Sequence, residues 1–310
     1  MLATLKALAD PTRMRLIALL SQGELTVQDL TVVLGMGQSR ISRHLKILVG
    51  AGILSVKRQG TWGYYRVNGA EGLFGEIWPS LQRRQAGLPE HRRDMAELAR
   101  LLEEQRNRSQ RFFDQHARDW DELAGKILPV ADYRNQLVAM VEPGRVVLEV
   151  GVGSGALLAA LASRAGRLIG VDHSPAMLRE ARERLAGAGL ASIDLRLGEM
   201  DHLPLSDGEV DVVLLNMVFH HALQPQTVLC ELNRVLAPGG RLLVADLQRH
   251  ELEWVRERLA DQWLGFEQKE LQGWLSATGF TVQDYQALVG QPGEQGAFIL
   301  SAARAAAAVD

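Results

Sequence analysis

Residues 146–155 read VVLEVGVGSG, an apolar run that ends in glycines at alternate positions, and residues 156–161 continue as ALLAAL. This order predicts a buried strand, a tight turn and a helix. Glycine allows positive φ and leaves no Cβ between the turn and a ligand lying on it. Such a turn is a seat for a nucleotide-like ligand, although many strand-to-helix turns carry glycines for packing only.

Polar residues follow the other apolar runs of this half of the chain. The run at 168–171 ends at Asp172, 21 residues after Gly151 (172 − 151), where a carboxylate can accept both hydroxyls of a ribose. Further apolar runs lie at 193–197, 210–215 and 241–245. Because the carboxyl ends of parallel strands share one edge of a sheet, their polar residues would line a single crevice at the topological switch point.

Four segments carry a family resemblance: VLEVGVGSG at 147–155, VDHSPAML at 171–178, GEMDHLPLSDGEVDVV at 198–213 and RVLAPGGRLLV at 234–244. Together they resemble the class I S-adenosylmethionine-dependent methyltransferases that act on small molecules, from about Arg111 to Arg304. The resemblance implies an α/β, Rossmann-like domain with a mostly parallel seven-stranded sheet. It also implies S-adenosylmethionine as cofactor, with S-adenosylhomocysteine as product or effector.

The resemblance further implies which residues bind the cofactor. Glu149 would lie near the methionine ammonium and Asn216 below the methionine. The glycines would lie under the cofactor, and Asp172 would bind the ribose diol. His173 or Met177 would lie beside the adenine, with Glu199 near its amine and Met200 near its ring. The full set is Glu149, Gly151, Gly153, Gly155, Asp172, His173, Met177, Glu199, Met200 and Asn216. Glu199 stands where the family usually has Asp. Residues 112–121 resemble the helical lid of these enzymes, whose aromatic side chains close over the cofactor.

His220 and His221 follow the fourth strand and are candidate general bases, because histidine titrates near neutral pH. A histidine pair is also a common way to finish this strand. Cys230 is the single cysteine, which excludes an intrachain disulfide and a thiolate metal cluster, and an arsenic methyltransferase needs several. We expect Cys230 to be buried for packing.

Composition and charge favour a two-domain cytoplasmic protein. The 310 residues contain no uninterrupted run of about 18 apolar residues. The apolar segment at the amino terminus is too short and too soon interrupted to be a signal peptide. Residues 1–70 hold nine Lys and Arg against three Asp and Glu, a net charge of +6. Because the whole chain has a net charge of −3, the remaining residues carry −9. A basic head on an acidic body is typical of a protein whose head alone meets nucleic acid.

Three helices are predicted in the head. Asp10-Pro11 begins one that runs to Leu20, Thr26 with Asp29 forms a capping box for 27–34, and a third covers 38–49. The third has Ile41, Leu45 and Leu48 on its inner face and Ser, Arg and Lys on its outer face, which fits a recognition helix in a major groove.

A β-hairpin is expected next, over 53–58 and 64–67, with Leu54, Val56, Tyr65 and Val67 facing inward. LADPTR at 8–13 with SRISRHLKIL at 39–48 resembles the winged-helix repressors of the ArsR family. This resemblance implies a homodimer on an imperfectly palindromic double-stranded DNA operator. The DNA-binding candidates are Gln38, Ser39, Arg40, Ser42, Arg43, Lys46, Lys57, Arg58 and Trp62.

No metal site is expected. The second helix carries Thr26-Val27-Gln28-Asp29 in place of the family's Cys-x-Cys, and the segment 90–94 offers a single His. A helix over 71–86 is predicted to break at Pro79, and Pro89 opens a long helix to about Arg111. Its thin stripe of Met95, Leu98 and Leu102 would pack either on a dimer mate or back on its own domain.

The predicted organisation is a winged-helix domain at 1–80, a helical linker with dimerisation and lid segments at 81–125, a methyltransferase domain at 126–304 and a tail at 305–310. Fraying is expected from Ala303 onward. The chain is interpreted as a DNA-binding transcriptional regulator with a methyltransferase domain acting on a small-molecule acceptor. One alternative is a non-catalytic repressor that senses the cofactor or its product; another is an NAD-dependent oxidoreductase, because G-x-G-x-x-A at 151–156 also fits the nicotinamide fingerprint. Neither the acceptor nor the operator can be read from the sequence.

Overall fold

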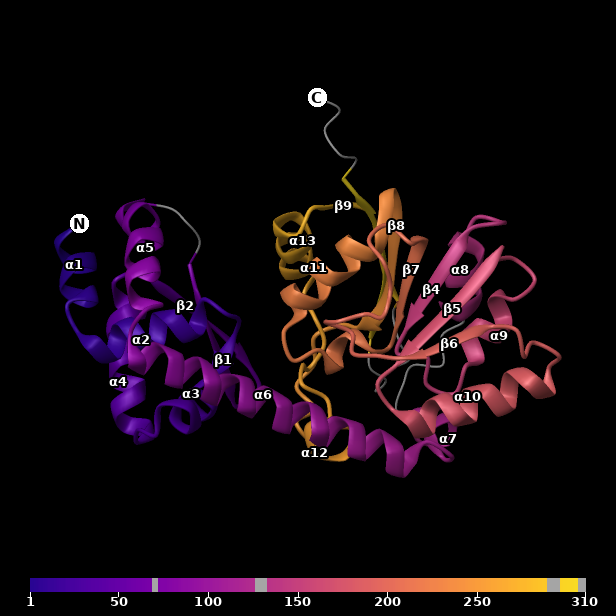
Figure 1. Cartoon of the computed structure of the whole chain (residues 1–310), viewed down its shortest axis with the longest axis horizontal. Coiled ribbons are helices and arrows are strands. Elements are labelled where there is room, and N and C mark those ends of the chain that lie inside the picture. Colours follow the sequence, from indigo (N-terminus) through magenta and orange to yellow (C-terminus); the bar gives the residue numbers. More distant parts are fainter. Residues whose placement is uncertain (69–71, 126–132, 289–295, 306–310) are drawn as a thin grey trace. The chain divides into compact units, whose positions relative to one another are not determined.

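The computed structural model describes residues 1–68, 72–125, 133–288 and 296–305. They form two compact units, Met1–Asn107 and Arg108–Asp310, drawn in Figure 1. The finer boundaries expected at residues 80, 125 and 304 stay predictions. Across the described residues, no helix combines the length and apolar character needed to cross a bilayer.

The smaller unit has the expected winged-helix arrangement. Its elements are α1 (Leu2–Leu8), α2 (Pro11–Leu20), β1 (Leu25–Thr26), α3 (Val27–Leu34), α4 (Gln38–Gly50), β2 (Leu54–Gln59), β3 (Trp62–Val67), α5 (Gly72–Gln85) and the first part of α6 (Pro89–His116). The strands form a sheet in the order β1-β3-β2. The short strand β1, which pairs with β3, was not anticipated.

Local capping explains where α2 and α3 begin. The Asp10 carboxylate accepts a hydrogen bond from the Arg13 backbone N–H at 3.0 Å, with Pro11 at the first helical position. Thr26 and Asp29 exchange side-chain to backbone hydrogen bonds in a capping box. Both predicted helix starts are therefore confirmed.

The hairpin differs from the prediction at one strand. Leu54 is buried, but Val56 on the same face is 38% exposed, and Tyr64 on the other face is buried. Leu54 belongs to the core of this unit and Val56 does not, whereas Gln59 at the end of β2 is again fully buried, so burial along this strand does not alternate. The Trp62 ring stacks on Tyr64 at 6.4 Å between centroids.

Two predictions for the helices that follow were wrong. Helix α5 continues through Pro79, because Phe74 and Trp78 stack at 5.6 Å and are buried in the core of this unit, and that packing outweighs the hydrogen bond that proline removes. Helix α6 runs 28 residues, past Arg111. Its apolar stripe packs back on its own unit: Leu98 is buried there. The expected first helical residue, Glu71, lies outside the described residues.

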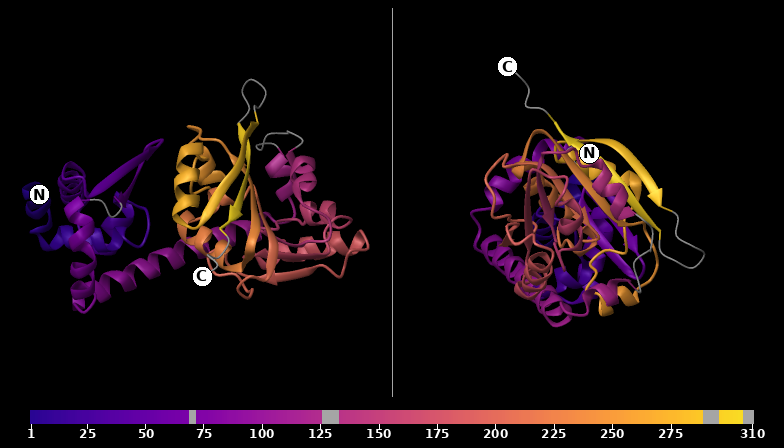
Figure 2. Two further views of the ribbon diagram at one scale, coloured as in Figure 1. Left: turned by 90° about the horizontal axis from the view of Figure 1, so that it is seen from above. Right: turned by 90° about the vertical axis from the view of Figure 1, so that its right-hand side faces the viewer.

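The larger unit is a three-layer α/β domain. After the end of α6 come α7 (Trp120–Gly125), α8 (Tyr133–Met140), β4 (Val146–Val150), α9 (Ala156–Leu161), β5 (Arg167–Asp172), α10 (Pro175–Gly187), β6 (Asp194–Leu197), β7 (Val210–Asn216), the 3-10 turn η1 (Phe219–His221), α11 (Pro225–Val235), β8 (Leu236–Leu247), α12 (Trp254–Arg258), α13 (Gln268–Ala277), β9 (Phe280–Leu288) and β10 (Ala297–Arg304). Figure 2 shows the sheet between two groups of helices.

The seven-stranded sheet has the order β6-β5-β4-β7-β8-β10-β9. The first five strands are parallel, whereas β10 pairs antiparallel with both β8 and β9. The predicted fold is confirmed. The chain reverses its direction of winding between β4 and β7, so the carboxyl ends of these strands define the switch point.

Three smaller expectations need correction or fall outside the described part. Cys230, expected to be buried, is exposed on α11 because it lies on the solvent side of this amphipathic helix. Ala303 and Arg304, expected to fray, form the last two residue pairs between β10 and β9. Residues 306–310 of the tail lie outside the described residues.

Candidate functional site

The glycine-rich turn after β4 adopts the backbone conformation that the sequence predicts. Gly151, Gly153 and Gly155 have φ of 73°, 53° and 79°. A Cβ on Gly151 would lie 2.3 Å from a methyl of Val218, and the Gly151 N–H donates to the Val171 carbonyl at 2.8 Å. The turn is therefore fixed against β5 and tolerates no side chain at its first glycine.

Asp172 ends β5 and faces this turn. Its Oδ2 accepts from the Gly153 N–H and its Oδ1 from the Ser174 N–H, both at 2.9 Å. Burial raises the pKa of Asp172. The carboxylate therefore ties two loops together, a role that sequence reasoning missed; each oxygen retains a lone pair, and the predicted ribose contact remains a proposal.

Glu149 and Asn216 lie at the carboxyl ends of β4 and β7, on either side of the switch point. Glu149 is 1% exposed, and the nearby Leu158 backbone and Asn216 side chain favour its ionised form and so oppose the rise of its pKa. Its second oxygen, Oε2, and Asn216 Oδ1 are buried and have no hydrogen-bond partner within the described ranges. A buried acceptor left without a donor costs about 1–3 kcal/mol, and each of these two oxygens can accept a hydrogen bond from a bound donor.

The electrostatics of Glu149 specify the charge of that donor. Burial, with the nearby Asp172 carboxylate adding to it, raises the pKa of Glu149 to about 8. A cationic group beside Glu149 would restore its ionised form, because an opposite charge favours the carboxylate. Arg134 already favours the ionised form from within the chain, and a bound cation close to the carboxylate would favour it further.

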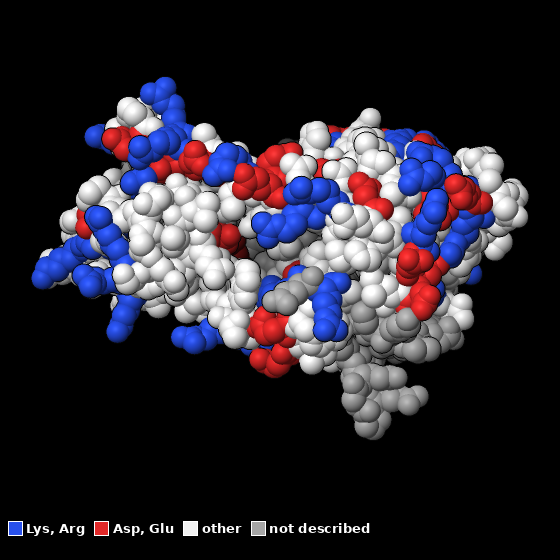
Figure 3. Space-filling model, turned by 90° about the horizontal axis from the view of Figure 1, so that it is seen from below, with Lys and Arg blue, Asp and Glu red and all other residues white. Residues whose placement is uncertain are grey.

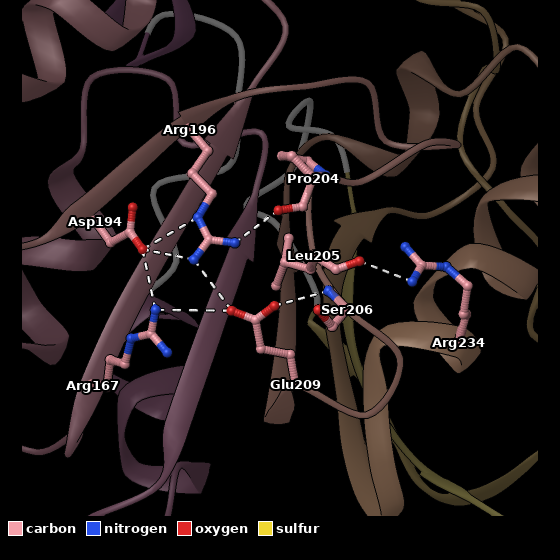
Figure 4. Close-up of polar contacts among 8 residues, drawn as sticks. All are labelled: Arg167, Asp194, Arg196, Pro204, Leu205, Ser206, Glu209 and Arg234. Carbon is pink, nitrogen blue, oxygen red and sulfur yellow. Dashed lines mark hydrogen bonds and ion pairs between the residues drawn. The ribbon is translucent and has the colours of Figure 1, made fainter.

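A loop anchored by arginines carries the adenine-side candidates Glu199 and Met200. Arg196 donates to the Pro204 carbonyl at 2.7 Å and pairs with Glu209 at 3.2 Å, and Arg234 donates to the Leu205 carbonyl at 2.9 Å. Figure 4 shows these contacts with Asp194 and Arg167. Glu199 and Met200 are half-buried.

The aromatic lid segment covers the other candidate residues. Phe113 is buried with Met177 and makes edge contacts with His173 and His221 at 5.5 and 5.0 Å between ring centroids. Asp114 accepts from the Ser174 hydroxyl at 2.6 Å and from the Ala176 N–H at 3.2 Å. The lid is thus docked by polar contacts on the loop that begins α10.

A buried ionic group lies beside this edge. His220 Nδ1 is 2.8 Å from Asp246 Oδ1 at the end of β8, and His220 Nε2 is 3.7 Å from Asp261 Oδ1. Burial opposes the charged form of His220, but the two carboxylates outweigh it and raise its pKa to about 9. Asp246 and Asp261 were missed, because no motif marks them and the tertiary fold alone brings them to His220.

His221 has a different environment. Burial and the charge of His220 hold the pKa of His221 well below its usual range. Its Nδ1 lies 3.4 Å from the Ala260 carbonyl oxygen and 3.8 Å from Asp261 Oδ1. The two candidate bases are therefore not equivalent: His220 is held as an ion between carboxylates, whereas His221 is neutral.

The recognition-helix candidates are arranged as predicted on α4. Ile41, Leu45 and Leu48 are fully buried. The outward residues are exposed, apart from half-buried Ser42: Gln38, Ser39, Arg40, Arg43 and Lys46. In the hairpin, Arg58 and Trp62 are exposed and Lys57 is half-buried. Figure 3 shows Lys and Arg projecting from the edge of the smaller unit, with some Asp and Glu beside them.

The fold and these sites define a class: a winged helix-turn-helix module joined to a Rossmann-like methyltransferase domain. Residues 10–56 match the family model described as bacterial regulatory protein, arsR family, and residues 148–244 match the model described as methyltransferase domain. The chain thus joins an ArsR-type helix-turn-helix to a methyltransferase domain, and these matches support S-adenosylmethionine as the cofactor of that domain. They favour this reading over the nicotinamide alternative.

Relatives differ in what they act on. An arsenite methyltransferase of Halobacterium salinarum is 40% identical over 112 residues, 35% of this chain and 29% of that protein. A demethylmenaquinone methyltransferase of Tropheryma whipplei is 34% identical over 140 residues, 44% of this chain and 57% of that one. A solved S-adenosylmethionine-dependent methyltransferase of Aquifex aeolicus shares the fold (TM-score 0.51, 22% identity, 62% of this chain and 98% of that one). The chain spans about a third to just over half of these two curated relatives.

Proposed function

We propose that the larger unit binds S-adenosylmethionine and transfers its methyl group to a small-molecule acceptor, and that the smaller unit binds a double-stranded DNA operator. The observation that carries the cofactor proposal is the pair of buried, unpartnered acceptors Glu149 Oε2 and Asn216 Oδ1 at the switch point. The ammonium of the cofactor is a donor of the required charge.

The remaining cofactor contacts follow from the same edge. We assign Gly151, Gly153 and Gly155 to the turn beneath the cofactor and Asp172 to the ribose. His173, Met177, Glu199 and Met200 are assigned to the adenine. When bound, the sulfonium supplies an activated methyl group, and the protein's contribution is to hold the acceptor in line with it and exclude water. Phe113, which contacts both His173 and His221, supports a role for the lid in this exclusion.

His221 is the proposed proton acceptor. His220 Nδ1 is engaged with Asp246 at 2.8 Å, so the protein holds this ring through its own carboxylate. His221 has no comparably short contact to a carboxylate: its nearest is Asp261 Oδ1 at 3.8 Å. We therefore assign different roles to the two histidines: His221 accepts the proton, and His220 positions His221.

Arsenite is not the acceptor that we propose, although one relative carries that name. The chain has one cysteine, Cys230, and it is exposed on α11. A lone thiol cannot form the multiple arsenic–sulfur bonds that hold trivalent arsenic. A small organic acceptor is the proposal that remains, acting in the cytoplasm where the operator also lies.

The cofactor proposal is tested by identifying the nucleoside that co-purifies with the full chain and by measuring S-adenosylmethionine affinity by calorimetry. Methyl transfer is then measured over a panel of hydroxyl, thiol and amine acceptors. We expect saturable binding with one site per chain and turnover of at least one acceptor. Absence of binding would refute the proposal, and binding without turnover would leave the domain as a sensor.

That sensor function is a second candidate, and helix α6 favours it. Leu98 of α6 is buried in the core of the smaller unit, and Phe113 of the same helix is buried in the lid of the larger unit. If the lid moves when a ligand binds, it would move the carboxyl-terminal half of α6. The amino-terminal half of the same helix is part of the core of the DNA-binding unit. Ligand binding changes DNA affinity only through a difference in affinity for the two states.

Calorimetry with and without operator DNA measures this coupling, since binding linkage is reciprocal. We expect the affinity for S-adenosylmethionine to differ at least about fivefold between free and DNA-bound protein. Light scattering of the DNA complex would show whether the bound form is the homodimer that we propose. Equal cofactor affinities would eliminate the sensor function and leave the catalytic one intact.

A further inference from the structure

Three buried side chains that the proposed cofactor contacts do not use lie together beside the sheet edge. His220 and His221 come from η1, and Asp261 follows α12, so two segments some 40 residues apart contribute (261 − 221). One ligand atom from each lies within 4.8 Å of the others. Both oxygens of Asp261, whose side chain is 1% exposed, lack a hydrogen-bond partner within the described ranges.

The spacing of this cluster does not suit direct hydrogen bonds. Asp261 Oδ1 lies 3.7 Å from His220 Nε2 and 3.8 Å from His221 Nδ1, beyond the 3.2 Å at which N–H···O bonds are effective. Two ligand atoms on a tetrahedral ion, each about 2.1 Å from it, are separated by about 3.4 Å. These two distances are thus nearer to those between ligands of one ion than to those of an ion pair in contact. The three ligand atoms lie within 4.8 Å of one another, so side-chain rotation would have to bring them to about 3.4 Å around an ion.

A carboxylate already orients one of these ligands. His220 Nδ1 faces Asp246 Oδ1 at 2.8 Å, which leaves Nε2 directed at Asp261. Asp246 is fully buried and is itself held by the backbone N–H of Phe219 at 2.8 Å. Histidines that ligate metals almost always donate their other ring N–H to such a group, which fixes the tautomer.

We propose that His220, His221 and Asp261 bind a divalent transition-metal ion, with Asp246 orienting His220. Two imidazoles and one carboxylate are the donors that Zn²⁺ accepts, and three protein ligands leave a fourth position open. The ion would join η1 to the segment after α12. It would also convert His221 from a proton acceptor into a ligand, so the metal-loaded and metal-free proteins would differ in how they activate an acceptor.

Metal binding is measured on the full chain without cofactor or DNA, so the result does not depend on the proposed function. The chelator-treated protein is titrated with Co²⁺, followed by its visible absorption, and then with Zn²⁺ against a chromophoric competitor. We expect one ion per chain and the absorption of four-coordinate Co²⁺. Asp246→Asn should weaken binding about 10- to 100-fold, and His220→Asn and Asp261→Asn by more than that.

His202→Asn is the matched control, because His202 is exposed and outside the cluster. It should leave the affinity unchanged. Circular dichroism establishes that each variant folds. X-ray absorption of the zinc-loaded wild-type protein needs no variant: two imidazoles and oxygen in the first shell support the proposal. Sulfur in that shell, which would place the ion on Cys230, overturns it, as does undiminished binding by folded Asp261→Asn or no uptake by the wild type.

Discussion

Helix α4 and the carboxyl edge of the larger sheet both present polar side chains, yet they do so under opposite conditions. The outward residues of α4, such as Arg40 and Arg43, are exposed, so water satisfies them whether or not DNA is bound. Glu149 is buried and Asn216 is half-buried, and Glu149 Oε2 and Asn216 Oδ1 are buried acceptors without a partner among the described residues. Exposed polar groups therefore say little about their ligand, whereas buried ones specify its charge and hydrogen-bonding character.

This difference predicts that a substitution at the sheet edge weakens ligand binding more than a substitution on α4 does. Glu149→Gln should weaken S-adenosylmethionine binding by about 30- to 150-fold, because a charge-assisted hydrogen bond contributes about 2–3 kcal/mol. Calorimetry measures the loss. Glu142→Gln is the control, since Glu142 pairs with Arg145 on the surface; equal effects of both variants would contradict the assignment of Glu149.

The same substitution should stabilise the cofactor-free protein. The pKa of the Glu149 carboxyl is about 8 in the folded state and 4.5 in the absence of the fold. Between these two pH values the folded protein keeps a proton that the unfolded chain has released. The stability that this group contributes is fully present below pH 4.5, is lost progressively as pH rises to about 8, and does not change further above that. At pH 8 the thermal midpoint of Glu149→Gln should exceed that of wild type; a lower midpoint would show that the charged form is favoured.

A buried ion pair in the smaller unit allows a comparison with no ligand involved. Arg15 contacts the two oxygens of Asp94 at 2.6 and 2.7 Å, and Asp94 is 2% exposed. Asp94→Ala should lower the free energy of unfolding of this unit by about 2 kcal/mol, less than for a fully buried pair because Arg15 is partly exposed. Chemical denaturation tests it. Glu97→Ala breaks an exposed pair on α6 and should have no measurable effect.

The pH dependence of cofactor affinity sharpens the comparison further. Below about pH 8 Glu149 is protonated in the free protein, and the ammonium requires the carboxylate. Binding near pH 7 should therefore release close to one proton, and the contribution of Glu149 should strengthen affinity by up to tenfold per pH unit until it levels off. Calorimetry in two buffers of different ionisation enthalpy measures the release. No proton release would show that Glu149 is already charged.

The smallest effect is expected on α4. Arg43→Ala should reduce DNA affinity about fivefold and lower the salt slope by about one, because one phosphate contact is lost among several. Fluorescence anisotropy at several salt concentrations measures both. Arg84→Ala, at the exposed end of α5, is the control. An unchanged slope for Arg43→Ala would mean that α4 does not contact the phosphates.

The sequence alone determined features that depend on near neighbours in the chain. Helix starts at Asp10 and Thr26, the buried stripe of α4 and the positive φ of Gly151 all follow from capping, periodicity and the absence of a Cβ. The order of apolar runs also predicted parallel strands with a shared polar edge, whereas the seven-stranded sheet was implied by the family resemblance. Each of these is a local rule that acts over a few residues.

Tertiary structure decided what local rules could not. Packing of Phe74 and Trp78 carried α5 through Pro79. The end of the core left Val56 exposed. Asp246 and Asp261 reached His220 only through the fold, since they are 26 and 41 residues away in the chain (246 − 220, 261 − 220). Burial and charge at a site are sums over neighbours from many segments, and no single segment of the sequence encodes them.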